Sequence, residues 1–450
     1  MLGAGLCVNL ATAAPVTTWQ TTLNTAYTPA VASTALPDDT PMHVAVSLKL
    51  QNRAALEAFI KNVYTPGNPQ FGQYLTPAQF TSRYAPSAEQ AQKVVDYLNV
   101  SGFKNVLLAD NRMLITATTT AAVAEKAFNT QLVQFQKDGR TVRAYTQDVQ
   151  VPASLGDVVL AVVGLENVVQ MKTGLQQQRE RAVFPPLTVK ASQQLASALK
   201  LNQASSKAST SAGTNSSSVG PAITVAAFPP TAWDVAYDAG NSPDGSGTAI
   251  AISTYGDDDS VVVDDLRQME RQFGLPYVPV EVRIPPNSQL AAESSGDDEW
   301  DLDSQSSTAL AHNVKKLILY TGDGSTDQLL WQYNQFATLA DALAGNMSYG
   351  TCELDAATGL LLPAISSSDQ AFMQAVAEGL SWHASTGDDG GVCSPINAAG
   401  APLGGIPLLA NYPDASPYVV AVGGTSLITD PSFNYSSEIA WTSGGGGISV

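Results

Sequence analysis

Apolar and polar positions follow two different patterns along this chain. Between residues 40 and 170, alternating segments such as HVAVSLKL from His43 predict strands, and SAEQAQKVVDYLNVSG has the spacing of an amphipathic helix. AALEAFIKNVY and AAVAEKAF add helical segments, and the remaining strand-like segments are NVLLAD, MLITAT, LVQFQ and RAYTQDVQV. Because antiparallel pairs alternate with crossing helices, this half predicts a small α+β sandwich.

From Thr224 the pattern changes to strand, helix, strand. AIAISTYG is a continuous apolar strand, and VVVDDLRQMERQFG is an amphipathic helix. Further short strands, which we expect to be buried, are VPVEVRI, KKLILY, GNMSYG, LSWHAST and YVVAVGG. Continuous apolar strands alternating with helices indicate an α/β fold with a parallel sheet covered on both faces. In such sheets the functional residues gather at the carboxyl ends of the strands.

Two segments lack the pattern of either half. Residues 176–222 are mostly Ser, Ala, Lys, Thr and Asn after QQQRERAV, so they predict a flexible linker and a site for proteolysis. The apolar start, residues 1–14, ends in Ala-Thr-Ala-Ala, a small-residue pattern typical of signal-peptidase sites. It lacks the basic start of a signal peptide, and an apolar N-terminal strand is the alternative interpretation.

Composition narrows the class of protein. With 44% hydrophobic residues in 450, the chain can bury a core, which excludes disorder as its overall state. Asp plus Glu number 40 against 22 Lys plus Arg, and the resulting charge of −18 argues against nucleic-acid and anionic-membrane partners. A charged fraction of only 14% is typical of an exported protein, and acidic surroundings would neutralise many carboxylates. No apolar run reaches the 18 residues of a membrane-spanning helix.

The three cysteines fit export as well. Cys7 lies in the signal-like segment, which leaves Cys352 and Cys393 as an even pair. In an exported protein we expect these two to form a disulfide. Two cysteines and three scattered histidines are too few ligands for a zinc site.

Two carboxylates in GDDEWDLDSQSSTALAH are candidates for proton transfer. Glu299 and Asp303 lie four residues apart, so a helix places them on one face, where they can share a proton. Taken alone, such a pair is more often a solvated helix face. The surrounding acidic cluster does not match a calcium-binding EF-hand, because neither the glycine at the sixth position nor the distal glutamate is in place.

Asp388 lies in HASTGDDGG, a glycine-flanked turn directly after an apolar strand. If desolvated, this carboxyl would stay protonated and could donate a hydrogen bond to a developing oxyanion. An ordinary turn aspartate is the alternative, and Asp389 competes for the same role.

No other catalytic arrangement has comparable support. Ser426 in GGTSL resembles a nucleophilic serine in a short turn, but none of the three histidines is placed at a strand end beside a serine. We expect His383 to be a core residue with its ring hydrogen-bonded. The chain contains no Asp-Thr-Gly or Asp-Ser-Gly for a pepsin-like dyad, and no glycine pattern for a nucleotide-binding enzyme.

Taken together, these motifs resemble the sedolisin family, the acid-acting serine-carboxyl peptidases. YLTPAQFTSRYAPSAEQAQKVVDYLNVSGF, AEKAFNTQLVQF and VPASLGDVVLAVVGLENV resemble the family's pro-kumamolisin-type activation domain. The peptidase domain is matched by FPPTAWDVAYDAG, GSGTAIAISTYG, EWDLD, NMSYG, AFMQAVAEGLSWHASTGDDG, SPYVVAVGGTSL and WTSGGGGIS. The resemblance thus covers most of residues 43–450 in the family's order.

The resemblance implies roles for three residues. EWDLD matches the family's Glu-x-x-Leu-Asp, which makes Glu299 the general base and Asp303 the carboxylate that orients it. TGDDG matches the turn of the oxyanion-hole aspartate, hence Asp388, with Asp389 in place of the family's usual small residue. Like-charge repulsion from Asp389 would then perturb the pKa of Asp388. GGTSL matches an earlier family segment that only imitates the nucleophile motif, so Ser426 is a decoy.

The implied organisation is a signal-like segment (1–14), an activation domain (15–175), a linker with the processing site (176–222) and the first part of a peptidase domain (223–450). The expected fold is a subtilisin-like parallel sheet flanked by helices, incomplete at its C-terminal side and preceded by a small ferredoxin-like α+β prodomain. The nucleophilic serine and the family's calcium site are expected after residue 450, so the chain looks truncated.

The implied function is that of a secreted, acid-acting serine endopeptidase made as a zymogen. Its partners would be protein or peptide substrates and its own prodomain as inhibitor, and we expect a monomer. The alternative is a secreted pseudopeptidase or binding protein on the same scaffold, which the missing nucleophile supports.

Overall fold

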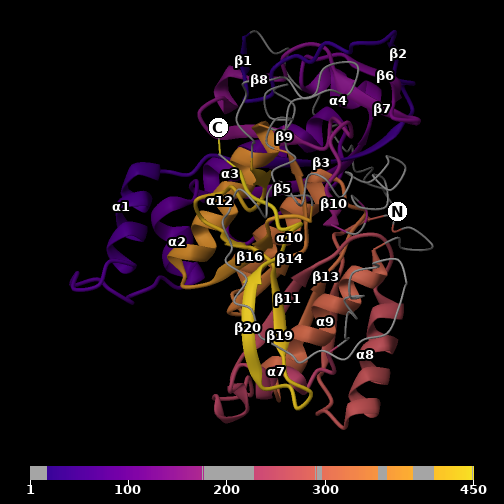
Figure 1. Cartoon of the computed structure of the whole chain (residues 1–450). Helices are drawn as coiled ribbons and strands as arrows, with labels where there is room; N and C mark the ends of the chain where they lie inside the picture. Colours follow the sequence, from indigo (N-terminus) through magenta and orange to yellow (C-terminus); the bar gives the residue numbers. More distant parts are fainter. Residues whose placement is uncertain are drawn as a thin grey trace, which may run out of the picture.

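A computed structural model of the chain describes residues 18–174, 176, 228–288, 290, 296–352, 362–388, 410–447 and 449. Most of the prodomain, coloured indigo to magenta, lies above the peptidase part, coloured from rose through orange to yellow (Figure 1). The signal-like segment with Cys7, all of the linker except Gln176, and both Asp389 and Cys393 lie outside the described residues.

The prodomain contains a four-stranded antiparallel sheet in the order β4-β5-β3-β9. In chain order, the four strands and the two helices that connect them are β3 (Pro41–Leu48), α3 (Ala88–Ser101), β4 (Lys104–Leu108), β5 (Leu114–Thr120), α4 (Ala121–Ala127) and β9 (Val159–Val163). This βαββαβ succession with that strand order is ferredoxin-like, so the predicted α+β prodomain is confirmed.

Smaller elements complete the prodomain. Two helices follow β3, namely α1 (Arg53–Val63) and α2 (Pro77–Tyr84). The other strands are β1 (Trp19–Thr21), β2 (Thr34–Ala35), β6 (Leu132–Lys137), β7 (Arg140–Tyr145), β8 (Gln150–Pro152) and β10 (Lys172–Thr173), with a 3₁₀ turn at Ala153–Leu155. Capping boxes at Thr76 and Ser87 begin α2 and α3, since each hydroxyl accepts the main-chain N–H of the glutamine three residues later.

The peptidase part contains a six-stranded sheet in which every neighbouring pair is parallel. Its order is β12 (Val280–Arg283), β13 (Lys316–Tyr320), β11 (Ala249–Ser253), β14 (Ala344–Met347), β16 (Ser381–Ser385) and β18 (Val420–Val422). Its helices are α7 (Ala232–Ala236), α8 (Ser260–Phe273), α9 (Asp297–Ala311), α10 (Thr326–Leu339) and α12 (Leu362–Ala377), with a 3₁₀ turn at Ala239–Asn241. The predicted α/β fold with a parallel sheet flanked by helices is confirmed.

Three predicted strands differ from expectation. GNMSYG forms two strands, because the chain leaves the main sheet after β14, and β15 (Tyr349–Cys352) joins a second sheet with β10 and β17 (Asn411–Tyr412). YVVAVGG and VPVEVRI were expected to be buried, but Val420 and Val422 of β18 are 46% and 47% exposed, and Val282 of β12 is 37% exposed. An edge strand has a neighbour on one side only, and within the described residues β18 has β16 alone.

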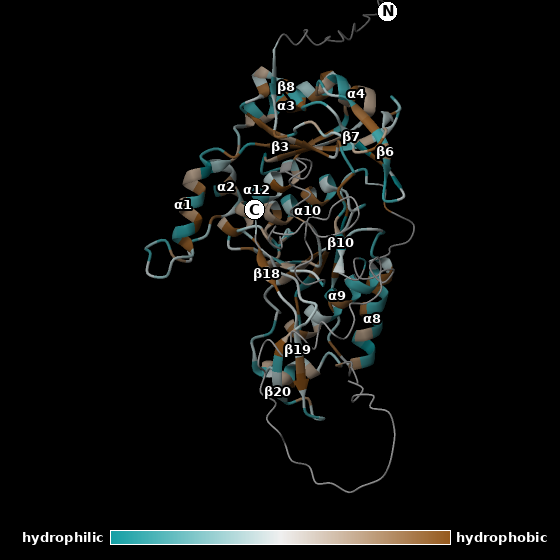
Figure 2. Cartoon of the chain, turned by 45° about the horizontal axis from the view of Figure 1, so that its top comes forward, coloured by the Kyte–Doolittle hydropathy of each residue, from teal (hydrophilic) through white to brown (hydrophobic). Residues whose placement is uncertain are grey.

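The prodomain is packed onto α10 and α12. Strand β3 contacts α10, while β9 and α1 contact α12, and Figure 2 shows the apolar residues of β3 above these two helices. Side-chain amides fix the register: Gln370 accepts the main-chain N–H of Leu50 at 2.8 Å, and Gln374 accepts the Asn111 side-chain N–H at 2.8 Å. Both halves contribute to one buried apolar cluster.

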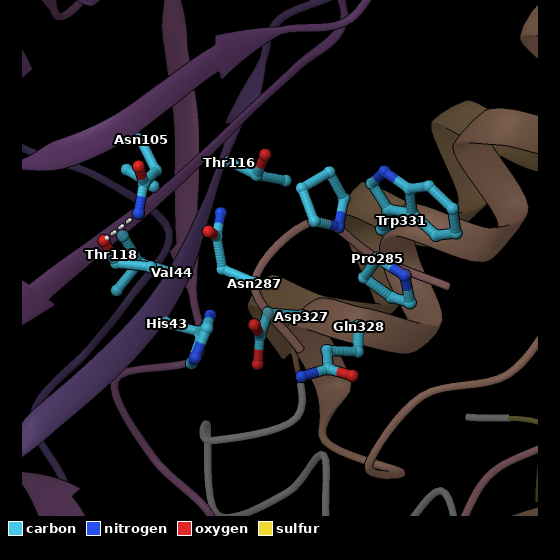
Figure 3. A pocket seen from close by; sticks show the side chains of 12 residues that line it. His43, Val44, Asn105, Thr116, Thr118, Pro285, Asn287, Asp327, Gln328 and Trp331 are labelled. Carbon is cyan, nitrogen blue, oxygen red and sulfur yellow. Dashed lines mark hydrogen bonds between the residues drawn. The ribbon is translucent and has the colours of Figure 1, made fainter. Parts of the chain in front are cut away.

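A small cavity lies within this contact (Figure 3). His43 of β3 and Asp327 of α10 are among its lining residues, and its volume is about 20 Å³. This space suffices for a single water molecule and not for a peptide, so it is not the candidate active site.

Candidate active site

Helix α9 carries Glu299 and Asp303. It begins after Gly296, whose carbonyl accepts the N–H of Glu299 at 2.9 Å and that of Trp300 at 3.1 Å. The Trp300 side chain is fully buried, and its indole N–H donates to the Tyr255 carbonyl at 3.2 Å. Burial of Trp300 fixes the rotation of the helix and thereby the direction in which both carboxylates point.

Asp303 reaches the end of strand β14. The Ser348 hydroxyl donates to Asp303 Oδ1 at 2.8 Å, and the Asn346 side-chain N–H donates to the Ser348 hydroxyl at 3.1 Å. Among the described residues Asp303 Oδ2 is buried without a hydrogen-bond partner. Within the described part of the chain, this carboxyl is therefore hydrogen-bonded on one oxygen only.

Burial raises the pKa of Asp303 well above its usual value, and the nearby charge of Glu299 raises it further. Hydrogen bonds to Ser348 and Asn346 oppose this rise, because they favour the ionised form. A buried carboxyl beside a second one holds a proton that the two can share. The arrangement fits a coupled acid/base pair better than a solvated helix face.

Asp388 follows the carboxyl end of β16, in a turn held on two sides. The Asn411 side chain donates to the Thr386 carbonyl at 3.0 Å, and the Gly445 N–H donates to the Gly387 carbonyl at 2.8 Å. A side chain at position 445 would collide with the Thr386 carbonyl, so the glycine-rich stretch can pack this closely against the turn only because residue 445 is glycine. Asp388 itself is half-buried.

The register of the sheet places these residues at one edge. Strands β14 and β16 are parallel, with Met347 opposite Ala384. Ser348, which holds Asp303, and Asp388 therefore both follow the carboxyl ends of neighbouring strands. This is the edge at which parallel α/β sheets assemble functional sites.

The end of the prodomain crosses the same edge. β10 pairs antiparallel with β15, with Lys172 opposite Gly350 and Thr173 opposite Tyr349. The next residue, Gly174, lies so close to Asp388 that an added Cβ would overlap the carboxylate oxygens. The tail formed by residues 172–174 thus covers the candidate site as an added strand.

Other candidate residues lie elsewhere. Ser426 belongs to a hairpin of β19 (Thr425–Thr429) and β20 (Tyr435–Ala440), opposite Ile439. His383 Nδ1 is 3.3 Å from the Gly345 carbonyl, so its ring has the expected hydrogen bond, although the side chain is only half-buried. His312 Nε2 is 2.8 Å from Asp234 Oδ1.

Two site residues, Ser348 and Tyr255, were not identified from the sequence. Ser348 directly follows β14, and Tyr255 is the second residue after β11. Because functional residues of parallel sheets gather at the carboxyl ends of strands, these positions could have been predicted from the sequence. The Cys352–Cys393 pairing stays a prediction because Cys393 lies outside the described residues.

Comparison with known proteins identifies the family. Residues 30–168 match the family described as "Pro-kumamolisin, activation domain". The chain is 34% identical over 424 residues to sedolisin of Pseudomonas sp. (strain 101), an alignment that covers 91% of this chain and 65% of sedolisin. This chain belongs to the sedolisin family. That membership and the parallel sheet together confirm the subtilisin-like fold class.

Other members of the sedolisin family are similar over different lengths. Xanthomonalisin of Xanthomonas sp. (strain T-22) is 34% identical over 446 residues, which are 94% of this chain and 50% of that protein. The chain thus spans between half and two thirds of the length of these relatives. A solved structure of Pseudomonas sedolisin, a serine-carboxyl proteinase in complex with two molecules of pseudo-iodotyrostatin, is 32% identical. It matches 47% of this chain and 57% of its own, with a TM-score of 0.41.

No three His, Cys, Asp or Glu side chains in the described ranges converge as metal ligands. No helix within the same ranges is long and apolar enough to cross a membrane.

Proposed function

We propose that this chain is part of a secreted, acid-acting serine endopeptidase that is made as a zymogen. The observation that carries the proposal is the edge of the parallel sheet. Asp303 reaches it from α9 with the charge of Glu299 nearby, Asp388 follows β16, and the tail of the prodomain lies across it as a strand on β15.

In this mechanism Glu299 accepts the proton of a serine hydroxyl while the serine oxygen attacks the scissile carbonyl. Asp303 orients Glu299, in the way that a third residue orients the base of a triad. The raised pKa of Asp303 supports this role, because a shared proton holds two carboxyl groups together. Protonated Asp388 donates a hydrogen bond to the developing oxyanion. We place the nucleophilic serine after residue 450, and activity should fall towards neutral pH as Asp388 loses its proton.

The prodomain acts as an intramolecular inhibitor. Its tail fills the place of a substrate strand, and its sheet is bound to α10 and α12. Self-cleavage within residues 176–222 in acid would release it.

Calcium is the cation that the resemblance implies, and we place its site after residue 450. The described residues offer no converging ligands for it. We therefore derive no catalytic step through calcium.

The first test is acid-triggered processing of the protein expressed from its natural gene. We expect a shift from pH 7 to pH 4 to release the prodomain, and Glu299→Gln to abolish that release. Asp298→Asn is the matched control, since its exposed side chain lies one residue away on the same helix and the variant should process normally. Gel electrophoresis with N-terminal sequencing measures the outcome.

Normal processing of the Glu299→Gln variant would remove Glu299 from the mechanism. If the wild-type protein shows no processing at any acidic pH and no peptidase activity, the alternative of a secreted pseudopeptidase or binding protein replaces this proposal.

A further inference from the structure

The tail of the prodomain is bound by one side chain in addition to β15, and that side chain is Tyr255. The Tyr255 hydroxyl accepts the main-chain N–H of Thr173 at 3.1 Å and donates to Gln176 Oε1 at 2.7 Å. The same Gln176 oxygen accepts the Thr173 N–H at 3.1 Å, and the Gln176 N–H donates to the Thr173 hydroxyl at 3.2 Å. Of the two hydrogen bonds of the Tyr255 hydroxyl within the described residues, one thus goes to the tail and the other to Gln176, two residues after it.

The Tyr255 ring is held rigidly. It packs edge-on against Trp300, with ring centroids 5.2 Å apart, and against Tyr349, at 5.6 Å. Gly324 also lies against the ring, since an added Cβ there would be 3.1 Å from it. Burial raises the pKa of Tyr255 above its usual value, so the hydroxyl keeps its proton.

Position relates this hydroxyl to the reaction. The amide that Tyr255 binds belongs to Thr173, and the following residue, Gly174, lies against Asp388. The indole N–H of Trp300 binds the Tyr255 carbonyl, and Trp300 is adjacent to Glu299 on α9. A peptide that replaces the tail on β15 would bring one of its own main-chain amides to the same hydroxyl. That amide would belong to the peptide residue just before the one that lies against Asp388.

We propose that Tyr255 is a substrate-positioning residue, whose hydroxyl binds a main-chain amide of the peptide that adds to β15. This inference rests on the proposed peptidase function. Because the bond is made to the main chain, it acts on substrates of any sequence and sets the register of the peptide relative to Asp388 and Glu299. In the zymogen, Thr173 and Gln176 form hydrogen bonds with the same Tyr255 hydroxyl.

The test compares Tyr255→Phe with the wild type in the acid-processed protein. Tyr237→Phe is the matched control, because this exposed tyrosine is in the same domain and its hydroxyl binds the side chain of Glu438, away from the tail. The probes are one peptide substrate and a series of its copies, each N-methylated at a single amide before the scissile bond.

We expect Tyr255→Phe to raise KM for the parent peptide by about three- to tenfold, the effect of one hydrogen bond, with kcat within about twofold. A single N-methylated peptide should be cleaved equally by both proteins, because it lacks the amide that the hydroxyl binds. Unchanged KM, or the same loss on every peptide of the series, would overturn the inference while leaving the peptidase function standing. A wild type that cleaves no peptide would overturn both.

A second measurement needs no activity. In the unprocessed chain, amide hydrogen exchange in the segment 172–176 should be faster in Tyr255→Phe by a similar factor, and unchanged in Tyr237→Phe. Equal exchange in wild type and Tyr255→Phe would show that the hydroxyl does not hold the tail, which also overturns the inference.

Discussion

At Asp303 the protein combines burial, a neighbouring negative charge and a chain of two hydrogen-bond donors on a single carboxyl group. Burial and Glu299 favour the protonated form, whereas Ser348 and Asn346 favour the ionised form. The balance is set by residues from two elements, α9 and the end of β14. A carboxyl in this position can exchange a proton with Glu299 under conditions in which an exposed aspartate is simply ionised.

Ser348→Ala tests this balance. Loss of the hydroxyl removes a hydrogen bond that favours ionised Asp303, so the pKa of Asp303 rises further. If catalysis needs the Glu299–Asp303 pair to accept a proton, the fall of the processing rate on the acid side of its pH profile should begin at a higher pH. A hydrogen bond to a charged group is worth about 1.5–3 kcal/mol, so the processing rate should fall by about tenfold or more.

The measurement is the rate of acid processing from pH 3 to pH 6. Ser381→Ala at the start of β16 is the control, as its side chain lies at the opposite end of the sheet. An unshifted acid limb in Ser348→Ala would separate Ser348 from the protonation of Asp303.

At the scale of elements, β10 is held at the site by more than its two residues of pairing. The ladder with β15 supplies main-chain bonds, Tyr255 supplies a side-chain bond, and Gly174 allows close approach to Asp388. A strand of this length is not stable by itself, so its position depends on the surfaces that receive it.

Gly174→Ala should displace the tail, because the added Cβ would overlap the Asp388 carboxylate. We expect trypsin to cleave the unprocessed variant after Lys172 several times faster than it cleaves the wild type. The control is Gly247→Ala, since a Cβ at Gly247 meets no atom within 4 Å. Equal trypsin cleavage of Gly174→Ala and wild type at neutral pH would mean that Gly174 does not lie against Asp388.

At the scale of the whole molecule, both the prodomain and the peptidase part bury carboxyl groups. Burial raises the pKa of Glu378, just after α12, to about 8, and those of Asp327 and Glu166 to about 7. Glu378 Oε1 accepts the Gln374 side-chain N–H at 3.0 Å, and Gln374 in turn binds Asn111 of the prodomain. Protonation of these groups is therefore linked to the stability of the joined halves.

The sign of the linkage follows from the direction of the shifts. Since the pKa of Glu378 is higher in the folded chain than in the unfolded one, the folded state binds more protons between about pH 4 and pH 8. The free energy of unfolding should fall as pH rises through this window and level off above pH 8. Glu378→Gln removes one titrating group, so Tm should change less between pH 6 and pH 9.

The comparison is made in the Glu299→Gln background, so that processing does not remove the prodomain. Glu89→Gln, on the exposed face of α3, is the control and should leave the pH dependence of Tm unchanged. An identical pH dependence with and without Glu378 would contradict the linkage.

The sequence by itself determined the elements and much of the site. Periodicity predicted β3, α3, β11, α8 and most of the other elements, because it reports which face of a local segment is buried. The four-residue spacing of Glu299 and Asp303 placed both on one helical face, and the strand-end position of Asp388 placed it at the edge of the sheet. Matching motifs in family order supplied the fold and the family.

Tertiary structure alone decided which distant segments meet. The chain leaves the main sheet between β14 and β15, and β15 then pairs with the distant strand β10. Ser348 binds Asp303, and Gly174 contacts Asp388, although each pair is far apart in the sequence. The strand-end position of Tyr255 is visible in the sequence, but its partner is not, since Thr173 lies in the other domain. Local periodicity carries no information on such contacts, because they depend on how whole layers pack. Packing likewise left β18 at an exposed edge despite its apolar sequence.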